Sequence, residues 1–295
     1  MTIADLLTES PTLFIGVAGL FGLLVGSFLN VVIYRLPVML DREWKHAAWY
    51  LLWGTDPRPA GEPFNLVVPR SACPQCDAQI TALQNIPVVS WLFLRGACAG
   101  CGVRIPARYP LIEALTAALT ALVAWRFGFT LDCAGAVLLT WSLIALTFID
   151  FDTQLLPDLI TLPLLWLGLT FSLINPESAV FAEPGSAIIG ALAGYLSLWS
   201  IYQGFKLATG KEGMGYGDFK LLAALGAWLG WQSLLPIVMI SAGVGLVAAL
   251  GMIVFRGHDR QIPIPFGPYL AVAGFVAMMW GPQLLDAYFR VSGMR

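Results

Sequence analysis

The fold class of this chain is decided by residues 131–152, which read LDCAGAVLLTWSLIALTFIDFD. From Cys133 to Ile149 this stretch carries no charged side chain. An α-helix needs about 20 mostly apolar residues to cross a bilayer, so residues 131–149 predict a membrane span. The span ends on two carboxylates, Asp150 and Asp152, and carboxylates in or beside a span are costly enough to suggest a function.

The whole chain continues this pattern. It is 58% hydrophobic and only 12% charged, about half the charged fraction of a typical soluble domain. Lipid must therefore cover much of its surface. Candidate spans lie at about 12–34, 109–127, 131–149, 156–174, 186–205, 219–233, 236–255 and 266–285. We expect an all-α polytopic membrane protein with about eight transmembrane helices, and the net charge of −2 argues against a nucleic-acid partner.

A long polar segment, residues 35–108, separates the first two spans and carries two Cys-x2-Cys pairs. The four residues are Cys73, Cys76, Cys98 and Cys101. Pro74 and Gly100 favour a turn at each pair, so that four thiolates converge on one ion. Four sulfurs complete a tetrahedral zinc site without an open position, which indicates a structural Zn2+. Two disulfides or free thiols are the alternative.

The distribution of Lys and Arg orients the chain. If residues 35–108 are cytoplasmic, thirteen of the sixteen basic residues lie on that side, as the positive-inside rule requires. The thirteen are Arg35, Arg42, Lys45, Arg58, Arg70, Arg95, Arg104, Arg108, Lys206, Lys211, Lys220, Arg256 and Arg260. We expect a first transmembrane helix in residues 1–34, a cytoplasmic zinc-binding domain in 35–108 and a transmembrane bundle in 109–295.

Carboxylates gather at two span ends on this cytoplasmic side. Asp150, Asp152 and Asp158 follow the third span, and Asp218 ends the stretch Gly213-Met-Gly-Tyr-Gly-Asp218. Two carboxylates brought together there could share one proton, so that one activates water and the other polarises a peptide carbonyl. Ordinary loop carboxylates near the headgroups are the alternative. With two histidines and no His-Glu-x-x-His motif, a catalytic zinc protease is not indicated.

In their order along the chain, these residues resemble the type IV prepilin peptidases. The resemblance covers nearly the whole chain. It comprises Gly26-Ser-Phe-Leu-Asn30-Val-Val-Ile-Tyr-Arg35-Leu-Pro37, the two cysteine pairs with Asn85-Ile-Pro87 between them, Arg108-Tyr109-Pro110, Glu113, and the Asp150 and Asp218 stretches. The Gly-x-Gly-Asp pattern is shared with presenilin-like proteases, and Pro265-Phe-Gly-Pro268 sits where those enzymes keep a proline motif near the active site.

The resemblance implies a specific activity. Members of the family cleave the basic leader of prepilins and pseudopilins on the cytoplasmic side of the bacterial inner membrane, after a glycine. They then methylate the new N-terminal amine with S-adenosylmethionine. The family's catalytic aspartates correspond to Asp150 and Asp218, with Asp152 and Asp158 as the next candidates, whereas Glu113 has no assigned role and the donor site is not located.

Two other classes remain open at the level of sequence. A transporter or channel also uses carboxylates in a helical bundle, although transporters bind substrate near the midplane rather than at one face. A zinc-stapled assembly protein without chemistry is the second alternative. Cleavage of a prepilin peptide by the purified protein distinguishes the peptidase from both alternatives.

Overall fold

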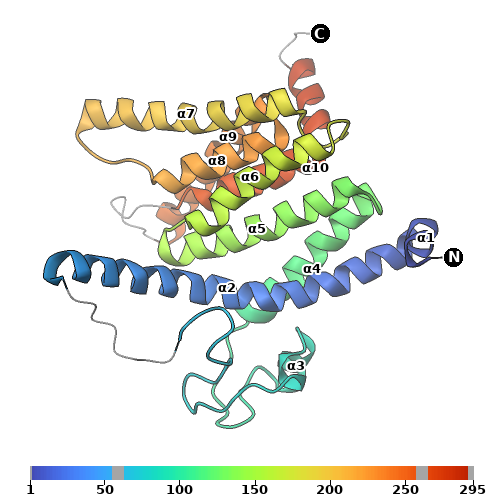
Figure 1. The fold of residues 1–295 in the computed structure, drawn as a ribbon, viewed down its shortest axis with the longest axis vertical. Helices are drawn as coiled ribbons and strands as arrows, with labels where there is room; N and C mark the ends of the chain where they lie inside the picture. Colours follow the sequence, from blue (N-terminus) through green and yellow to red (C-terminus); the bar gives the residue numbers. More distant parts are fainter. Residues whose placement is uncertain (1, 55–62, 257–264, 292–295) are drawn as a thin grey trace. The chain divides into compact units, whose positions relative to one another are not determined.

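The computed structural model describes residues 2–54, 63–256 and 265–291, and its chain forms two compact units, Met1–Phe129 and Thr130–Arg295 (Figure 1). Arg58 and Arg260, which the charge argument uses, lie outside the described residues. Within the described ranges the regular elements are helices, accompanied by two isolated β-bridges. This agrees with the expected all-α class.

The first unit is built on two antiparallel helices. A short helix α1 (Ile3–Glu9) precedes α2 (Pro11–Trp53), and α4 (Arg108–Phe127) returns alongside α2. Phe14 near the start of α2 contacts Phe129 just beyond α4, with ring centroids 5.4 Å apart. A Cβ at Gly26 would stand 2.7 Å from the Cα of Glu113, so the missing side chain lets the helices approach closely.

Helix α2 is longer than the sequence predicts. The expected first span ends at position 34, whereas α2 continues through Pro37 to Trp53. Its 43 residues correspond to a length of about 65 Å, roughly twice the hydrocarbon thickness of a bilayer. Residues 38–53 contain no glycine or proline to stop the helix, and the chain first leaves it at Gly54, in the left-handed conformation at φ 65°.

Residues 63–107, the described part of the connection between α2 and α4 beyond Gly54, have little regular structure. This segment contains a 3-10 turn η1 (Leu83–Asn85) and the short helix α3 (Val89–Phe93). The buried Arg35 of α2 holds the start of this segment, donating to the carbonyl oxygens of Asn65 and Pro69 at 2.9 and 2.7 Å. A charged side chain of α2 thereby replaces a hydrophobic core as the anchor of the segment.

The second unit is a helical bundle arranged around α8. Its elements are α5 (Leu131–Thr153), α6 (Asp158–Ile174), α7 (Pro184–Thr209), α8 (Tyr216–Leu229), η2 (Trp231–Ser233), α9 (Leu234–Arg256) and α10 (Gly267–Val291). Every residue from Leu221 to Gly230 is buried. The backbones of α7 and α8 touch where Gly190 meets Gly226, and Trp228 packs against Phe171 at a centroid distance of 5.3 Å.

Each of the eight candidate spans corresponds to a helix. Five helical segments among the described residues are long and apolar enough to cross a membrane: Pro11–Trp53, Arg108–Phe127, Leu131–Thr153, Pro184–Thr209 and Trp231–Gly251. The count of eight membrane crossings stays a prediction. The expected sixth span at 219–233 is too short to be counted among these five, because α8 has only 14 residues and ends where Gly230 turns the chain at φ 81°.

Candidate active site and metal centre

Asp150 lies in the last turn of α5 and is buried, with 5% of its surface exposed. The helix ends four residues later at Gln154, which adopts a left-handed φ of 53°. The Oδ2 atom of Asp150 has no hydrogen-bond partner in the structure. An unpaired buried carboxylate oxygen is costly, so packing alone does not explain this position at the end of α5.

Asp218 lies in the first turn of α8 and is also buried, with 7% exposed. Negative charge is favoured at a helix N-terminus, where unpaired N–H groups and the helix dipole face it. The glycines that precede Asp218 allow close packing, because a Cβ at Gly217 would stand 2.6 Å from the Cβ of Leu156.

The two aspartates meet where three helix ends converge. Leu156 follows α5, packs against Gly217 in the first turn of α8, and also packs against Gly267 at the start of α10. A Cβ at Gly267 would stand 2.6 Å from Oδ2 of Asp150. Asp150 and Asp218 are close enough to interact electrostatically, and they are the two buried carboxylates in the described part of the second unit.

The other two candidate aspartates are placed differently. Asp152 is exposed, although it lies only two residues from Asp150. Asp158, the first residue of α6, accepts hydrogen bonds from Lys220 Nζ at 2.6 and 2.8 Å and is therefore engaged in an ion pair. The structure thus brings Asp150 and Asp218 together and leaves Asp152 and Asp158 outside the buried pair.

This end of the second unit is also its basic end. Lys206 lies in the last turn of α7, Lys211 in the following connection and Lys220 near the start of α8. The clustering matches the charge bias from which the orientation was predicted, while the orientation itself stays a prediction.

Sequence reasoning did not find every residue at this site. Gly267 belongs to a stretch that was related to the site only by comparison with presenilin-like proteases, and Leu156 carried no signal. The Asp158–Lys220 pair was also missed. A signal for it existed, because a lysine in the first turns of a helix is unfavourable unless an acidic partner lies nearby.

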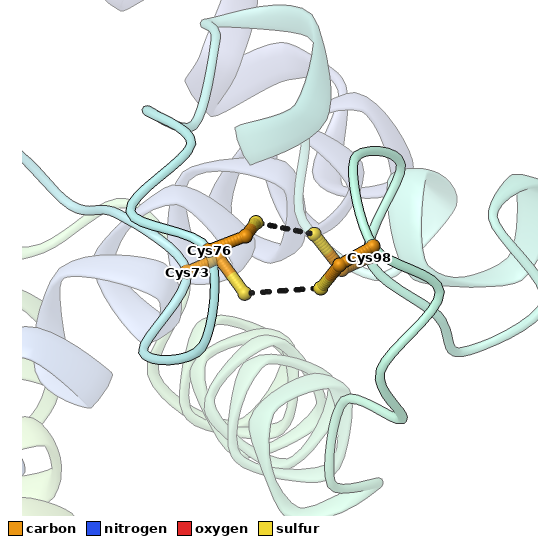
Figure 2. Close-up of side chains that lie close together, drawn as sticks. Cys73, Cys76 and Cys98 are labelled. Carbon is orange, nitrogen blue, oxygen red and sulfur yellow. Dashed lines mark hydrogen bonds between the residues drawn. The ribbon is translucent and has the colours of Figure 1, made fainter.

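The four cysteines of the first unit form a compact cluster. Their Sγ atoms all lie within 4.8 Å of one another, with Cys73 and Cys101 at 3.7 Å and Cys76 and Cys98 at 4.0 Å (Figure 2). Four sulfurs bound tetrahedrally at about 2.3 Å from zinc are separated by about 3.8 Å, so the spacing fits a metal ion. The same distances exclude disulfides, whose sulfurs lie about 2.0 Å apart.

Each cysteine pair sits in a turn closed by the backbone. Cys73 donates its N–H to Ala78 at 3.0 Å, and Cys98 donates to Val103 at 2.8 Å. The residue after each pair has a left-handed φ, 54° at Asp77 and 73° at Gly102, which confirms the predicted turns.

The environment of one of the four cysteines, Cys98, favours a thiolate. The backbone N–H groups of Cys101 and Gly100 face Cys98 Sγ and lower the pKa of this thiol to about 6. The N–H of Gly100 donates to this sulfur at 3.4 Å. A deprotonated sulfur is the form that binds a metal ion.

Glu113 is the third buried carboxylate of the described chain and lies on α4, with 9% exposed. Its Oε2 accepts the backbone N–H of Val88 at 2.7 Å. Val88 has φ 59°, a strained conformation for a β-branched residue. Glu113 therefore holds a strained turn next to α3, in addition to lying near the start of its helix.

Comparison with known proteins divides the chain in a similar way. Residues 20–127 match the family described as Bacterial Peptidase A24 N-terminal domain. Residues 137–250 match the Type IV leader peptidase family, and this second match contains both Asp150 and Asp218.

Relatives of the full chain carry one shared name, Prepilin leader peptidase/N-methyltransferase. The protein of Aeromonas hydrophila is 55% identical over 279 residues, covering 94% of each chain. That of Pseudomonas aeruginosa is 50% identical over 295 residues and covers both chains completely. That of Neisseria gonorrhoeae is 50% identical over 92% of each chain. No solved structure matches. Identity of this extent over whole chains, together with the buried aspartate pair and the cysteine cluster, shows that the chain belongs to the type IV leader peptidase family and is an enzyme.

Proposed function

We propose that this enzyme cleaves the leader peptide of prepilins and pseudopilins with Asp150 and Asp218 as its catalytic pair. The observation that carries the proposal is the pair itself: two buried carboxylates from different helices, one with an unpaired oxygen. Helix ends at one side of a bundle suit a substrate whose apolar helix lies in lipid while its charged leader stays in water. The cut falls after a glycine on the cytoplasmic side.

The geometry supports general acid–base hydrolysis. One carboxylate accepts a proton from water, whose oxygen attacks the scissile carbonyl carbon. The other, protonated, carboxyl donates a hydrogen bond and then its proton to the carbonyl oxygen, giving a neutral tetrahedral intermediate. The tetrahedral intermediate then breaks down: its C–N bond breaks, and the leaving amine takes a proton from the aspartate pair. Two adjacent carboxyls avoid double ionisation by sharing one proton, which provides both roles.

The same enzyme methylates the new N-terminal amine with S-adenosylmethionine as donor. Support comes from the two activities in the relatives' name and from the separate family match of the first unit. The donor supplies an electrophilic methyl group. The described residues hold no strand, and so no sheet edge of the kind that binds the donor in soluble methyltransferases.

The four-cysteine cluster binds one structural Zn2+. Cys73, Cys76, Cys98 and Cys101 supply all four ligands, so no position is open for a substrate or a catalytic water. The ion stabilises a segment that has few helices of its own.

The enzyme is a multi-pass protein of the bacterial inner membrane with the cysteine cluster and the aspartate pair facing the cytoplasm. Cysteine labelling of exposed loop positions from either side of the membrane tests this orientation. Labelling of positions 63–72 from the periplasm would contradict it.

The decisive experiment for the peptidase uses purified protein in detergent and a prepilin peptide with a Gly-Phe junction. Wild-type protein should cleave after the glycine, and Asp218→Asn should not. Methylation of a pre-cleaved pilin by Asp218→Asn is expected to continue, since methyl transfer needs neither aspartate. A wild-type protein that leaves the peptide intact, or an active Asp218→Asn, would refute the aspartyl mechanism.

A further inference from the structure

One ion pair near the aspartates is not explained by local helix preferences. Lys220 Nζ lies 2.6 Å from Oδ1 and 2.8 Å from Oδ2 of Asp158. Asp158 is favourable where it stands, at the first residue of α6, because a helix N-terminus attracts negative charge. Lys220 is unfavourable near the start of α8 for the same reason, so its stabilisation must come from Asp158.

The pair joins the two helices near the catalytic end of the bundle. Lys220 lies two residues after Asp218, and Asp158 lies two residues after the buried Leu156 that packs against Gly217. Helices α6 and α8 are neighbours in the ribbon (Figure 1). Near the end of α8, Trp228 Nε1 donates to the carbonyl oxygen of Leu164 in α6 at 2.8 Å. The ionic contact is therefore a polar link between α6 and the first turns of α8.

A force acts on this part of α8 that the pair opposes. Asp150 and Asp218 interact as like charges, so whenever both are ionised they push the end of α5 and the start of α8 apart. Asp218 is held by backbone contacts at its own helix start, and no basic side chain is hydrogen-bonded to it among the described residues. The ion pair between Lys220 and Asp158 restrains the first turns of α8 by tying them to α6.

We propose that the Asp158–Lys220 ion pair is a positioning contact that keeps the Asp218 carboxyl facing Asp150. The inference rests on the proposed peptidase function and assigns no catalytic role to either residue. Displacing a catalytic group by about 1 Å can cost on the order of a hundredfold in rate. An exposed ion pair contributes little to overall stability, so its loss should affect the reaction more than the fold.

The test compares single variants with a charge exchange. Asp158→Asn and Lys220→Gln should each lower kcat for the Gly-Phe prepilin peptide by about ten- to a hundredfold, with KM little changed. The double variant Asp158→Lys/Lys220→Asp should recover most of the loss. The matched control is Asp41→Asn, which removes the 2.7 Å ion pair with Lys45 in α2 and should leave kcat at the wild-type value.

Melting temperatures of all variants should stay near that of the wild type. Full kcat in both single variants would overturn the proposal, as would an exchange variant no better than the single variants, or losses of kcat that follow losses of melting temperature. Asp218→Asn assayed in parallel separates the two claims. If Asp218→Asn is inactive while both single variants are fully active, only the positioning role fails; if Asp218→Asn is active, the peptidase proposal itself fails.

Discussion

The metal centre and the aspartate pair are built in contrasting ways. Each cysteine pair is formed within one short turn, and both pairs lie in the loop segment between α2 and α4. Asp150 and Asp218 lie on two helices that are far apart in the sequence, α5 and α8. They come together where Leu156, Gly217 and Gly267 pack against one another. The first site depends on chain-local geometry, whereas the second depends on the packing of the whole bundle.

The largest expected effect comes from the aspartates. Asp150→Asn or Asp218→Asn should abolish cleavage, because an amide cannot accept or hold the shared proton. The wild-type pH–rate profile should be bell-shaped, since activity needs one ionised and one protonated carboxyl. Peptide cleavage assays from acidic to alkaline pH measure both effects. Metal content and melting temperature should be unchanged, so that the two sites separate cleanly.

A different result would relocate the site. Full activity in Asp150→Asn, combined with loss in Asp152→Asn or Asp158→Asn, would keep the mechanism and move its first member along the connection.

Gly267→Ala tests the claim that packing builds the pair. The added Cβ would stand 2.6 Å from Asp150 Oδ2 and 3.0 Å from Leu156 Cδ1, so Asp150 must shift. A shift of that size should lower kcat by about a hundredfold. Gly243→Ala in α9 is the control, because a Cβ there meets nothing within 4 Å. Equal activity in the two variants would show that α10 does not shape the site.

Removing a cysteine tests the other site in this comparison, the four-cysteine cluster. Cys76→Ser or Cys101→Ser should lower the zinc content from one ion per chain and destabilise the first unit, because binding of the ion contributes to folding. Elemental analysis and thermal unfolding check both outcomes. Cys133→Ala, which removes the fifth cysteine from α5, should keep the metal. Fully active wild-type protein without zinc would contradict the proposal.

The smallest effect is expected from Asp152→Asn. Asp152 is exposed and lies outside the buried pair, so the variant should retain most of the wild-type kcat. If Asp152→Asn lost as much activity as Asp150→Asn, Asp152 would have a role in the substrate complex that its exposure in the free enzyme does not reveal.

The same contrast decides how much of the molecule could be predicted. The cysteine cluster follows from spacing alone, because two residues between cysteines bring the sulfurs of a pair together in a turn. The choice of Asp150 and Asp218 followed from their position at span ends and from family resemblance. Their burial and the exposure of Asp152 could not be derived, since both depend on how α5, α8 and α10 pack.

Helix lengths show where pattern reading fails. The expected span ended at residue 34 because hydropathy marks only the part of a helix that lipid could cover. The helix itself continues to Trp53, since no residue before Gly54 stops it. The short α8 was merged with η2 into one span for the opposite reason, because apolar residues continue across Gly230 although the helix does not. The roles of Gly267 and Lys220 lie in contacts with distant segments, which periodicity cannot report.

The shortness of α8 has a consequence for how this helix fits a membrane. Fourteen residues extend about 21 Å, whereas the hydrocarbon layer is about 30 Å thick. Enclosed by the other helices, α8 is subject to a hydrophobic mismatch that the surrounding protein, rather than lipid, must accommodate. Asp218 lies in the first turn of this helix. If the proposed peptidase activity depends on how α8 is accommodated, the rate of cleavage should vary with bilayer thickness.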